Sequence, residues 1–265
     1  MRAFEVVSGA LEEVGERSAV LPAGAYSTLR TYGRTRVYHL ADHVRRLDGS
    51  ARLQGRVGSL SHEAVRTALR DALAATGHAE SRVRLTWAPP RLFVSVEPFT
   101  PLPDSLYREG AWCVAVPVRR DNPHAKDTRF IGTAADAYAH LPAGAHEGLM
   151  VAEDGAILEG LSSNFFGIMG GALHTEEDRV LPGLTRSLVL DVAADLLPRA
   201  PRALRRDEVG RAQECFITSA SRGVLPVVRI DAVAVGTGAP GPLSREIRER
   251  YERVVEADAE DVRGA

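Results

Sequence analysis

Apolar and polar positions alternate in short runs through the first half of the chain, and two longer runs there have helical spacing. The alternation predicts strands at residues 4–7, 25–32, 35–38, 82–87, 92–97 and 112–118. Gly33 lies between the second and third of these strands, which we expect to form a β-hairpin. Apolar positions three and four residues apart predict helices at residues 40–53 and 61–75. Ser61 can cap the second helix, and Gly77 can end it.

The same two patterns recur after residue 126. Strands are predicted at residues 148–152, 156–159, 164–169, 172–175, 214–218 and 224–230. Helices are predicted at residues 130–141, 185–197 and 242–255. Asp154-Gly155 and Gly170-Gly171 are typical hairpin turns. Residues 98–109 are rich in proline and are expected to be irregular, and the tail after residue 255 is expected to fray.

Strands and helices that mix in two blocks predict an α+β protein of two α/β subdomains joined by a short linker. The run Arg-Arg-Asp-Asn-Pro at residues 119–123 has the composition of a connector. We therefore expect a smaller N-terminal subdomain at residues 1–118, a linker at 119–125 and a larger C-terminal subdomain at 126–265.

Composition narrows the class of protein without naming a function. A net charge of −2 and no apolar run near the ~20 residues of a membrane span favour neither a nucleic-acid nor a membrane partner. Cys113 and Cys215 lie in no motif and are interpreted as buried thiols of a reducing, cytoplasmic compartment. The eight histidines show no metal-ligand spacing, so no metal site is expected.

Lysine is nearly absent from this chain. Of 33 basic Lys and Arg residues, only Lys126 is a lysine. An arginine-rich chain retains lysine where arginine cannot substitute, and a desolvated lysine can form a Schiff base with a carbonyl. The alternative is a residual surface lysine, since most lysines are solvated.

Four further stretches have a chemical interpretation beside an ordinary structural one. Glu159 ends a strand before a turn of small residues, where an acid is often simply solvated. Residues 183–185, Gly-Leu-Thr, open a helix and either bind phosphate or only cap it. Residues 217–221 end a strand in hydroxyl groups, which can form an anion nest. Residues 42–47 put arginines on an early helix, usually a solvated face.

With one lysine, these stretches supply what pyridoxal phosphate requires: an amine for its aldehyde, an acid for its pyridine nitrogen and anion-binding groups for its phosphate. At this point the chain resembles the fold-type IV, or class IV, pyridoxal-phosphate aminotransferases. That family includes branched-chain and D-amino-acid aminotransferases, R-selective amine transaminases and aminodeoxychorismate lyase. The resemblance extends from about residue 26 to residue 228. It rests on Glu-Gly-Leu-Ser-Ser-Asn-Phe-Phe at 159–166, Gly-Leu-Thr-Arg at 183–186, His-Val-Arg-Arg-Leu at 43–47 and Gly-Ala-Tyr at 24–26.

The resemblance implies a role for each matching residue. Lys126 would form the Schiff base and carry the α-proton, Glu159 would pair with the pyridine nitrogen, and Arg46 would bind the phosphate. The other cofactor contacts would come from Leu184, Thr185, Ser219, Ala220, Ser163 and Asn164, with Arg119 approaching the ring hydroxyl. The larger subdomain would bind the cofactor, and the family forms homodimers with the active site near the subunit interface.

The substrate side departs from the family's patterns. Ile131 stands where branched-chain enzymes carry a tyrosine, and the short turn Trp-Ala-Pro-Pro at 87–90 lacks the arginine and histidine of D-amino-acid enzymes. Tyr26 and Trp87 would line the substrate side, and Arg84 or Arg91 would replace the missing carboxylate-binding group.

Three functions remain open at this stage. The first is a transaminase acting by a ping-pong route on an amino donor and a 2-oxo acid. The second is a lyase like the aminodeoxychorismate enzyme, which releases pyruvate. The third is a non-enzymatic binding protein in which the lysine has no chemical role.

Overall fold

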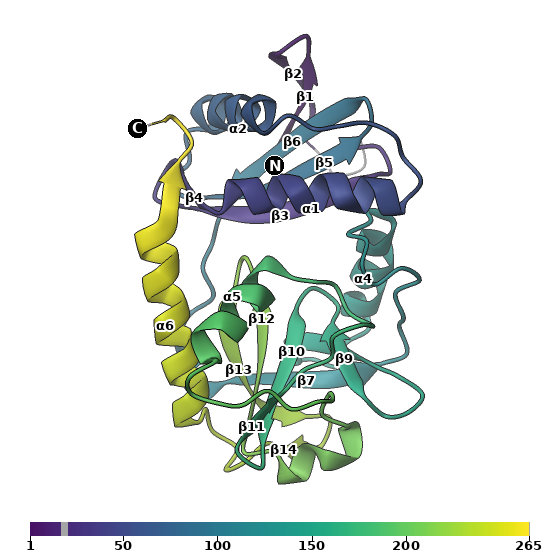
Figure 1. The fold of residues 1–265 in the computed structure, drawn as a ribbon, viewed down its shortest axis with the longest axis vertical. Helices are drawn as coiled ribbons and strands as arrows, with labels where there is room; N and C mark the ends of the chain where they lie inside the picture. The colour runs from purple at the N-terminus through teal and green to yellow at the C-terminus, as the bar shows by residue number, and fades with distance from the viewer. Residues whose placement is uncertain (17–20, 265) are drawn as a thin grey trace. The chain divides into compact units, whose positions relative to one another are not determined.

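The computed structural model describes residues 1–16 and 21–264 and divides into two compact units (Figure 1). Unit 1 consists of Met1–Pro101, His124–Ile131 and Val254–Ala265, and unit 2 of Leu102–Pro123 and Gly132–Arg253. This division differs from the expected subdomains at 1–118 and 126–265, because the segment that contains Lys126 belongs to unit 1. The main chain of that segment is hydrogen-bonded to residues 24–26, where Tyr26 N donates to Lys126 O at 2.9 Å.

Unit 1 is an antiparallel sheet covered by two helices. Its strands follow the order β15-β4-β3-β5-β6-β1-β2. Their bounds are β1 Arg2–Val7, β2 Ala10–Gly15, β3 Ala25–Tyr32, β4 Arg36–Tyr38, β5 Ser81–Ala88, β6 Arg91–Pro98 and β15 Ala259–Asp261. Helices α1 (Leu40–Leu53) and α2 (His62–Thr76) share one apolar core with the sheet (Figure 1). The predicted capping of α2 is confirmed, since Ser61 Oγ accepts from Ala64 N and Gly77 ends the helix at a φ of 67°.

Unit 2 is a mixed sheet in the order β11-β10-β12-β13-β7-β8-β9, with β14 beside β13. Its strands are β7 Ala111–Val116, β8 Glu147–Val151, β9 Ile157–Gly160, β10 Asn164–Met169, β11 Ala172–His174, β12 Glu214–Ser219, β13 Gly223–Ile230 and β14 Val233–Ala234. The pairs β13–β7 and β7–β8 are parallel, and the other pairs are antiparallel. A further pairing of Asn164 with Glu159 joins β10 to β9. The succession of paired strands from β10 through β12, β13, β7, β8 and β9 therefore closes back on β10.

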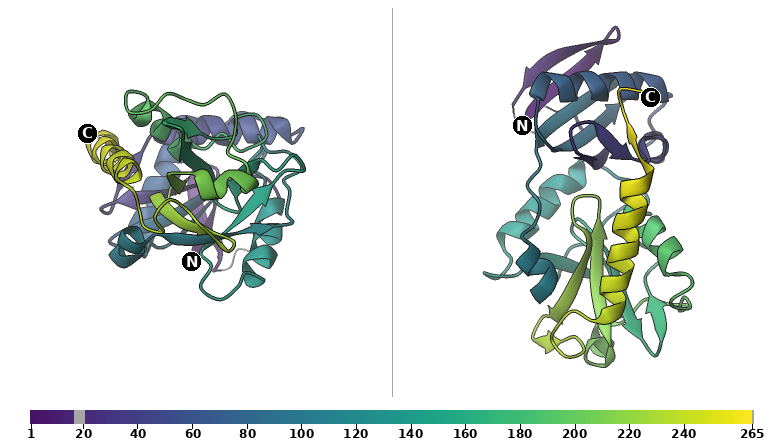
Figure 2. Two further views of the ribbon diagram at one scale, coloured as in Figure 1. Left: turned by 90° about the horizontal axis from the view of Figure 1, so that it is seen from below. Right: turned by 90° about the vertical axis from the view of Figure 1, so that its left-hand side faces the viewer.

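The helices of unit 2 are α3 Asp104–Glu109, α5 Leu184–Ala193 and the 3₁₀ helix η2 Arg206–Arg211. Helices α4 (Arg129–Ala139) and α6 (Pro242–Asp258) contribute residues to both units. The first turn of α6 lies beside β12, where the Glu214 carboxylate accepts from Leu243 N at 3.0 Å and Ser244 N at 2.7 Å (Figure 2).

Several segments differ from the sequence-based expectation. Residues 98–109 contain helix α3 instead of being wholly irregular, and α5 ends at Ala193 instead of residue 197. The tail is ordered as far as residue 264, because β15 pairs with β4 and the Val262 side chain is buried in the core of unit 1. Cys113 and Cys215 are free and buried. Among the described residues, no helix is both long and apolar enough to cross a membrane.

Candidate active site

Lys126 is held in unit 1 by its own main chain. Lys126 N donates to Ser50 Oγ at 3.1 Å, and Thr128 N donates to Gly24 O at 2.9 Å. The Lys126 Nζ atom lies 4.5 Å from the centre of the Tyr26 ring, within the range of a cation–π contact. The side chain is half-buried. The interpretation as a residual surface lysine is therefore not supported, and two residues expected at the site, Lys126 and Tyr26, lie together.

Arg46, on helix α1, is a half-buried cation with a neutral partner. Its terminal nitrogen donates to Ser27 Oγ at 2.7 Å, and its Nε atom is buried without a hydrogen-bond partner in the described part of the chain. Burial lowers the pKa of Arg46 to about 10. The neighbouring Arg45 differs, because it is exposed and paired with Asp42. No carboxylate within residues 1–16 or 21–264 forms an ion pair with Arg46, so this site is suited to an external anion such as a phosphate.

The partner of Arg46 is itself fixed by a histidine. Because the Ser27 hydroxyl accepts from Arg46, its single proton is available for His43 Nδ1, 2.8 Å away. His43 is then neutral, with its own proton on Nε2. Burial and the positive charges of Arg46, Lys126 and His39 hold the pKa of His43 well below its ordinary value. The chain Arg46–Ser27–His43 therefore orients the guanidinium without neutralising it.

This arrangement predicts a pH dependence of stability. Above pH about 6.5 His43 is neutral in both the folded and the unfolded chain. In that range it therefore contributes no pH dependence to the free energy of unfolding. Below that pH the unfolded chain binds a proton that the folded chain excludes, and stability falls by up to about 1.4 kcal/mol per pH unit. His43→Asn keeps an acceptor for Ser27 but does not titrate. Thermal unfolding from pH 8 to 5 should therefore decline less steeply in this variant, and equal slopes would refute the assignment.

Glu159 ends strand β9 of unit 2 and is 2% exposed. One of its oxygens, Oε2, accepts from Asn164 Nδ2 at 3.2 Å and from Leu181 N at 3.1 Å. The other, Oε1, accepts from Arg120 Nε at 3.1 Å. Glu159 is thus a buried carboxylate held by three donors, which argues against a solvated turn residue.

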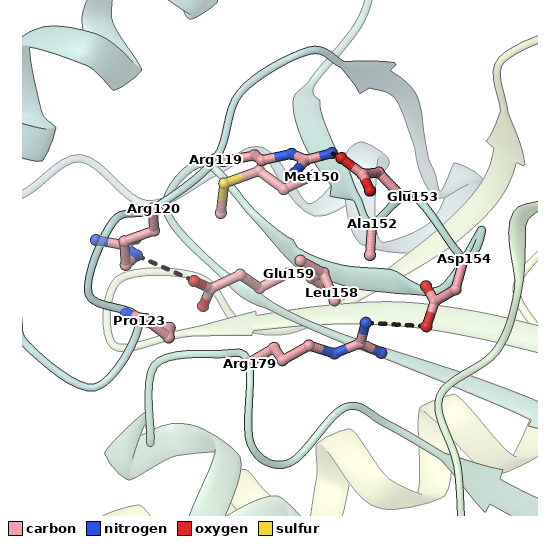
Figure 3. A pocket seen from close by; sticks show the side chains of 10 residues that line it. All are labelled: Arg119, Arg120, Pro123, Met150, Ala152, Glu153, Asp154, Leu158, Glu159 and Arg179. Atoms are coloured by element: carbon pink, nitrogen blue, oxygen red, sulfur yellow. Dashed lines mark hydrogen bonds and ion pairs between the residues drawn. The ribbon is translucent and has the colours of Figure 1, made fainter.

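Arg120, and not Arg119, lies beside this acid. The Arg119 side chain is 63% exposed and pairs with Glu153, whereas that of Arg120 is 8% exposed. Figure 3 shows Arg120 and Glu159 pointing toward one another at a cavity of about 430 Å³. The cavity is lined by Arg119, Arg120, Pro123, Met150, Ala152, Glu153, Asp154, Leu158, Glu159 and Arg179. Arg120 is not among the residues predicted from the sequence, although the Arg-Arg pair at 119–120 was the available signal.

Two segments of unit 2 offer groups suited to a phosphate. Helix α5 begins after Gly183 without a side-chain cap, so the backbone N–H groups of Leu184 and Thr185 have no partner within the helix. A Cβ atom at Gly183 would lie 2.1 Å from Asn164 Oδ1, which explains the glycine. At the end of β12, Ser219 Oγ is buried without a hydrogen-bond partner among the described residues. Ala220 follows in the turn and offers only its backbone.

The remaining expected residues are not all placed with these groups. Ser163 Oγ donates to Glu147 at 3.0 Å, so it serves a different acid. In unit 1, Tyr26 and Arg84 lie on one face of the sheet, because Tyr26 pairs with Thr86 and Thr28 pairs with Arg84. Trp87 is buried in the core on the opposite face. Arg91 is 55% exposed and pairs with Glu5.

Comparison with known proteins agrees with the family resemblance seen in the sequence. The family model described as class IV amino-transferase matches residues 24–230. A D-alanine aminotransferase of Bacillus licheniformis is 36% identical over 109 residues, which are 40% of this chain and 38% of the relative. The chain thus spans about two fifths of that relative's length.

Solved structures match over nearly the whole chain. A branched-chain aminotransferase of Thermoproteus uzoniensis with norvaline is 24% identical, with a TM-score of 0.81 and 99% of both chains covered. The branched-chain amino acid aminotransferase of Escherichia coli is 20% identical, with a TM-score of 0.78, and the match covers 98% of this chain and 97% of that one. These likenesses confirm the predicted fold-type IV architecture.

Proposed function

Because the chain belongs to the class IV aminotransferase family, we propose that it is a pyridoxal-phosphate-dependent transaminase. It would move an amino group from an amino acid or amine to a 2-oxo acid by a ping-pong route. The observation that carries the proposal is the single lysine, held half-buried against Tyr26 in the unit that also holds Arg46, which pairs with no acid among the described residues. The relative and the two structures named above are aminotransferases, which favours transfer over the lyase reaction.

The side chains present fit this cofactor, which class IV aminotransferases use. Bound pyridoxal phosphate supplies an aldehyde for the amino group and a protonated ring that withdraws electrons from the adjacent carbon. Lys126 would hold the aldehyde through Nζ and then move the proton at the substrate's α-carbon. Glu159 Oε1, which lies 3.1 Å from Arg120 Nε, would accept from the ring nitrogen.

The phosphate contacts that the family resemblance implies are assigned in each unit by itself. Arg46 would supply the positive charge, with its guanidinium oriented by Ser27. Leu184 and Thr185 would donate backbone N–H groups at the positive end of helix α5. Ser219 would donate its buried hydroxyl, and Ala220 would donate its backbone N–H. That these residues serve the cofactor is part of the proposal, as is a cytoplasmic homodimer, which the family resemblance supports.

Arg84 is the residue we propose for the substrate carboxylate. It shares the sheet face of Tyr26, and burial lowers the pKa of its guanidinium, as expected for a cation placed to meet an anion out of water. Arg84→Gln should raise the KM for a 2-oxo acid by roughly 100-fold, because a hydrogen-bonded charge pair is lost. Arg91→Gln, at the exposed Glu5 pair, is the matched control and should leave KM unchanged. Equal KM values for the Arg84 variant and the unsubstituted enzyme would exclude this role.

A panel of amino donors tests the proposed function directly. The purified protein with added pyridoxal phosphate is mixed with L-amino acids, D-amino acids and R-amines in turn, and the absorbance of the pyridoxamine form is followed. A transaminase converts the cofactor with at least one donor and returns it on addition of a 2-oxo acid. Conversion by none of them, or pyruvate release from an aminodeoxychorismate-like substrate, would contradict the proposal.

A further inference from the structure

A second buried acid of unit 2 collects donors from three separate segments. Glu147, the first residue of β8, is 0% exposed. Its carboxylate accepts from Tyr138 Oη at 2.5 Å, Ser162 Oγ at 3.1 Å, Ser163 Oγ at 3.0 Å and an Arg222 terminal nitrogen at 2.5 Å. Such a group is costly to bury, and the structure gives it nearly every hydrogen bond that two carboxylate oxygens can accept.

Three of these donors come from the turns that carry the expected cofactor residues, and the fourth, Tyr138, lies on helix α4. Ser162 and Ser163 form the turn from Glu159 to Asn164. Arg222 closes the turn that follows Ser219, where Arg222 N donates to Ser219 O at 3.2 Å. Glu147 therefore connects the turn with the acid for the ring to the turn with a hydroxyl for the phosphate.

Close packing shows that the first turn is built around Glu147. A Cβ atom at Gly160 would lie 2.2 Å from Ser163 Oγ and 2.9 Å from Glu147 Cγ. Only glycine leaves room for the carboxylate beside the turn. The glycine that follows Glu159 in the sequence motif thus makes room for Ser163 and Glu147, and the contact of Glu147 with the motif is not visible in the sequence.

We propose that Glu147 is a positioning residue that holds the Glu159–Asn164 turn and the Ser219–Arg222 turn in the single arrangement that binds the cofactor. The inference rests on the proposed function, because it assumes that both turns contact pyridoxal phosphate. Glu147 itself acts through Ser162, Ser163 and Arg222.

The charge states support a fixed network. Burial lowers the pKa of Arg222, but Glu147 and Tyr138 outweigh this and leave the pKa above its ordinary value. Burial and the charge of Glu147 raise the pKa of Tyr138 to about 12. At neutral pH Arg222 is therefore charged and Tyr138 keeps the proton that it donates to Glu147. Neither Arg222 nor Tyr138 changes its charge near pH 7, as a fixed support requires.

The test separates cofactor binding from folding. Glu147→Gln alone leaves the Arg222 charge buried without its partner, so the double variant Glu147→Gln/Arg222→Gln, which removes both charges, is used beside it. We expect the cofactor-free double variant to unfold near the temperature of the unsubstituted protein. Its dissociation constant for pyridoxal phosphate should rise about tenfold or more, since charge-assisted hydrogen bonds to both turns are lost. The circular dichroism of the bound cofactor should also change, because the ring is held differently.

Two further variants complete the test. Tyr138→Phe removes one donor and no charge, and should weaken cofactor binding about threefold. Thr76→Ala is the control: it removes a hydroxyl that donates to Ala72 O at 3.0 Å at the end of helix α2 in unit 1, outside both turns, and should leave binding unchanged. Tight, unchanged binding by the double and Tyr138 variants would overturn the inference and leave the proposed function standing. Failure of the unsubstituted protein to bind pyridoxal phosphate would overturn both.

Discussion

Replacing Lys126 by arginine is expected to reduce turnover to background, a loss on the order of 10⁵-fold. Arginine keeps the positive charge over the Tyr26 ring but cannot act as an amine nucleophile. The fold should survive, because the contacts that fix this segment are made by main-chain atoms that the substitution leaves in place. The variant separates the chemistry of lysine from its charge.

Two measurements decide the outcome. Transaminase activity is assayed with the best donor from the panel, and the visible absorbance of the added cofactor shows whether it is attached to the protein. Arg129→Lys is the matched control, since it makes the reverse exchange three residues later at an exposed side chain that pairs with Asp127. This control should retain full activity. Substantial turnover by the Lys126 variant would remove the lysine from the mechanism.

Replacing Glu159 by glutamine is expected to lower kcat about 100-fold or more, because the fixed charge opposite the ring nitrogen is lost. The change also leaves Arg120 buried without its carboxylate, so the free energy of unfolding falls by about 3–5 kcal/mol. The kcat is therefore measured at a temperature where circular dichroism shows the variant to be folded. Under those conditions any loss of rate reflects the site.

The same cavity supplies the control for Glu159. Glu153→Gln makes the identical exchange at an acid that lines the cavity but is 84% exposed and pairs with Arg119. It should leave both kcat and stability unchanged, because an exposed ion pair contributes little. An unchanged kcat in the folded Glu159 variant would show that this acid does not serve the ring.

Patterns within short stretches of sequence predicted the elements that depend on interactions between neighbouring residues. Helical spacing and the Ser61 and Gly77 caps gave α2 almost to the residue. Period-two alternation in β5 separates Arg84 from Trp87, but only the register with β3 shows which of them shares the face of Tyr26. The tail strand β15 is three residues long and depends on β4, more than 200 positions earlier, so no local pattern could reveal it.

The residues of the candidate site also fall into those that the sequence predicted and those that it did not. Lys126, Glu159 and Arg46 were found because the chemistry requires those residue types in a recognisable order. Arg120 was missed because it lies in an irregular connector, where no periodicity tells which of two adjacent arginines is buried. Glu147 was missed because its partners are up to 75 positions away, and its role appears only when the turns are folded.

The attachment of Lys126 to strand β3 limits how this gene can be recombined. A crossover placed near residue 118, where the sequence suggests a boundary, would take the first 118 residues from one parent and the lysine from another. Residues 124–131 would then lie beside Gly24, Tyr26 and Ser50 from the other parent. In this chain the segment forms hydrogen bonds with all three residues. Chimeras that keep residues 21–53 and 124–131 from one parent should therefore give active enzymes more often than chimeras that exchange whole halves.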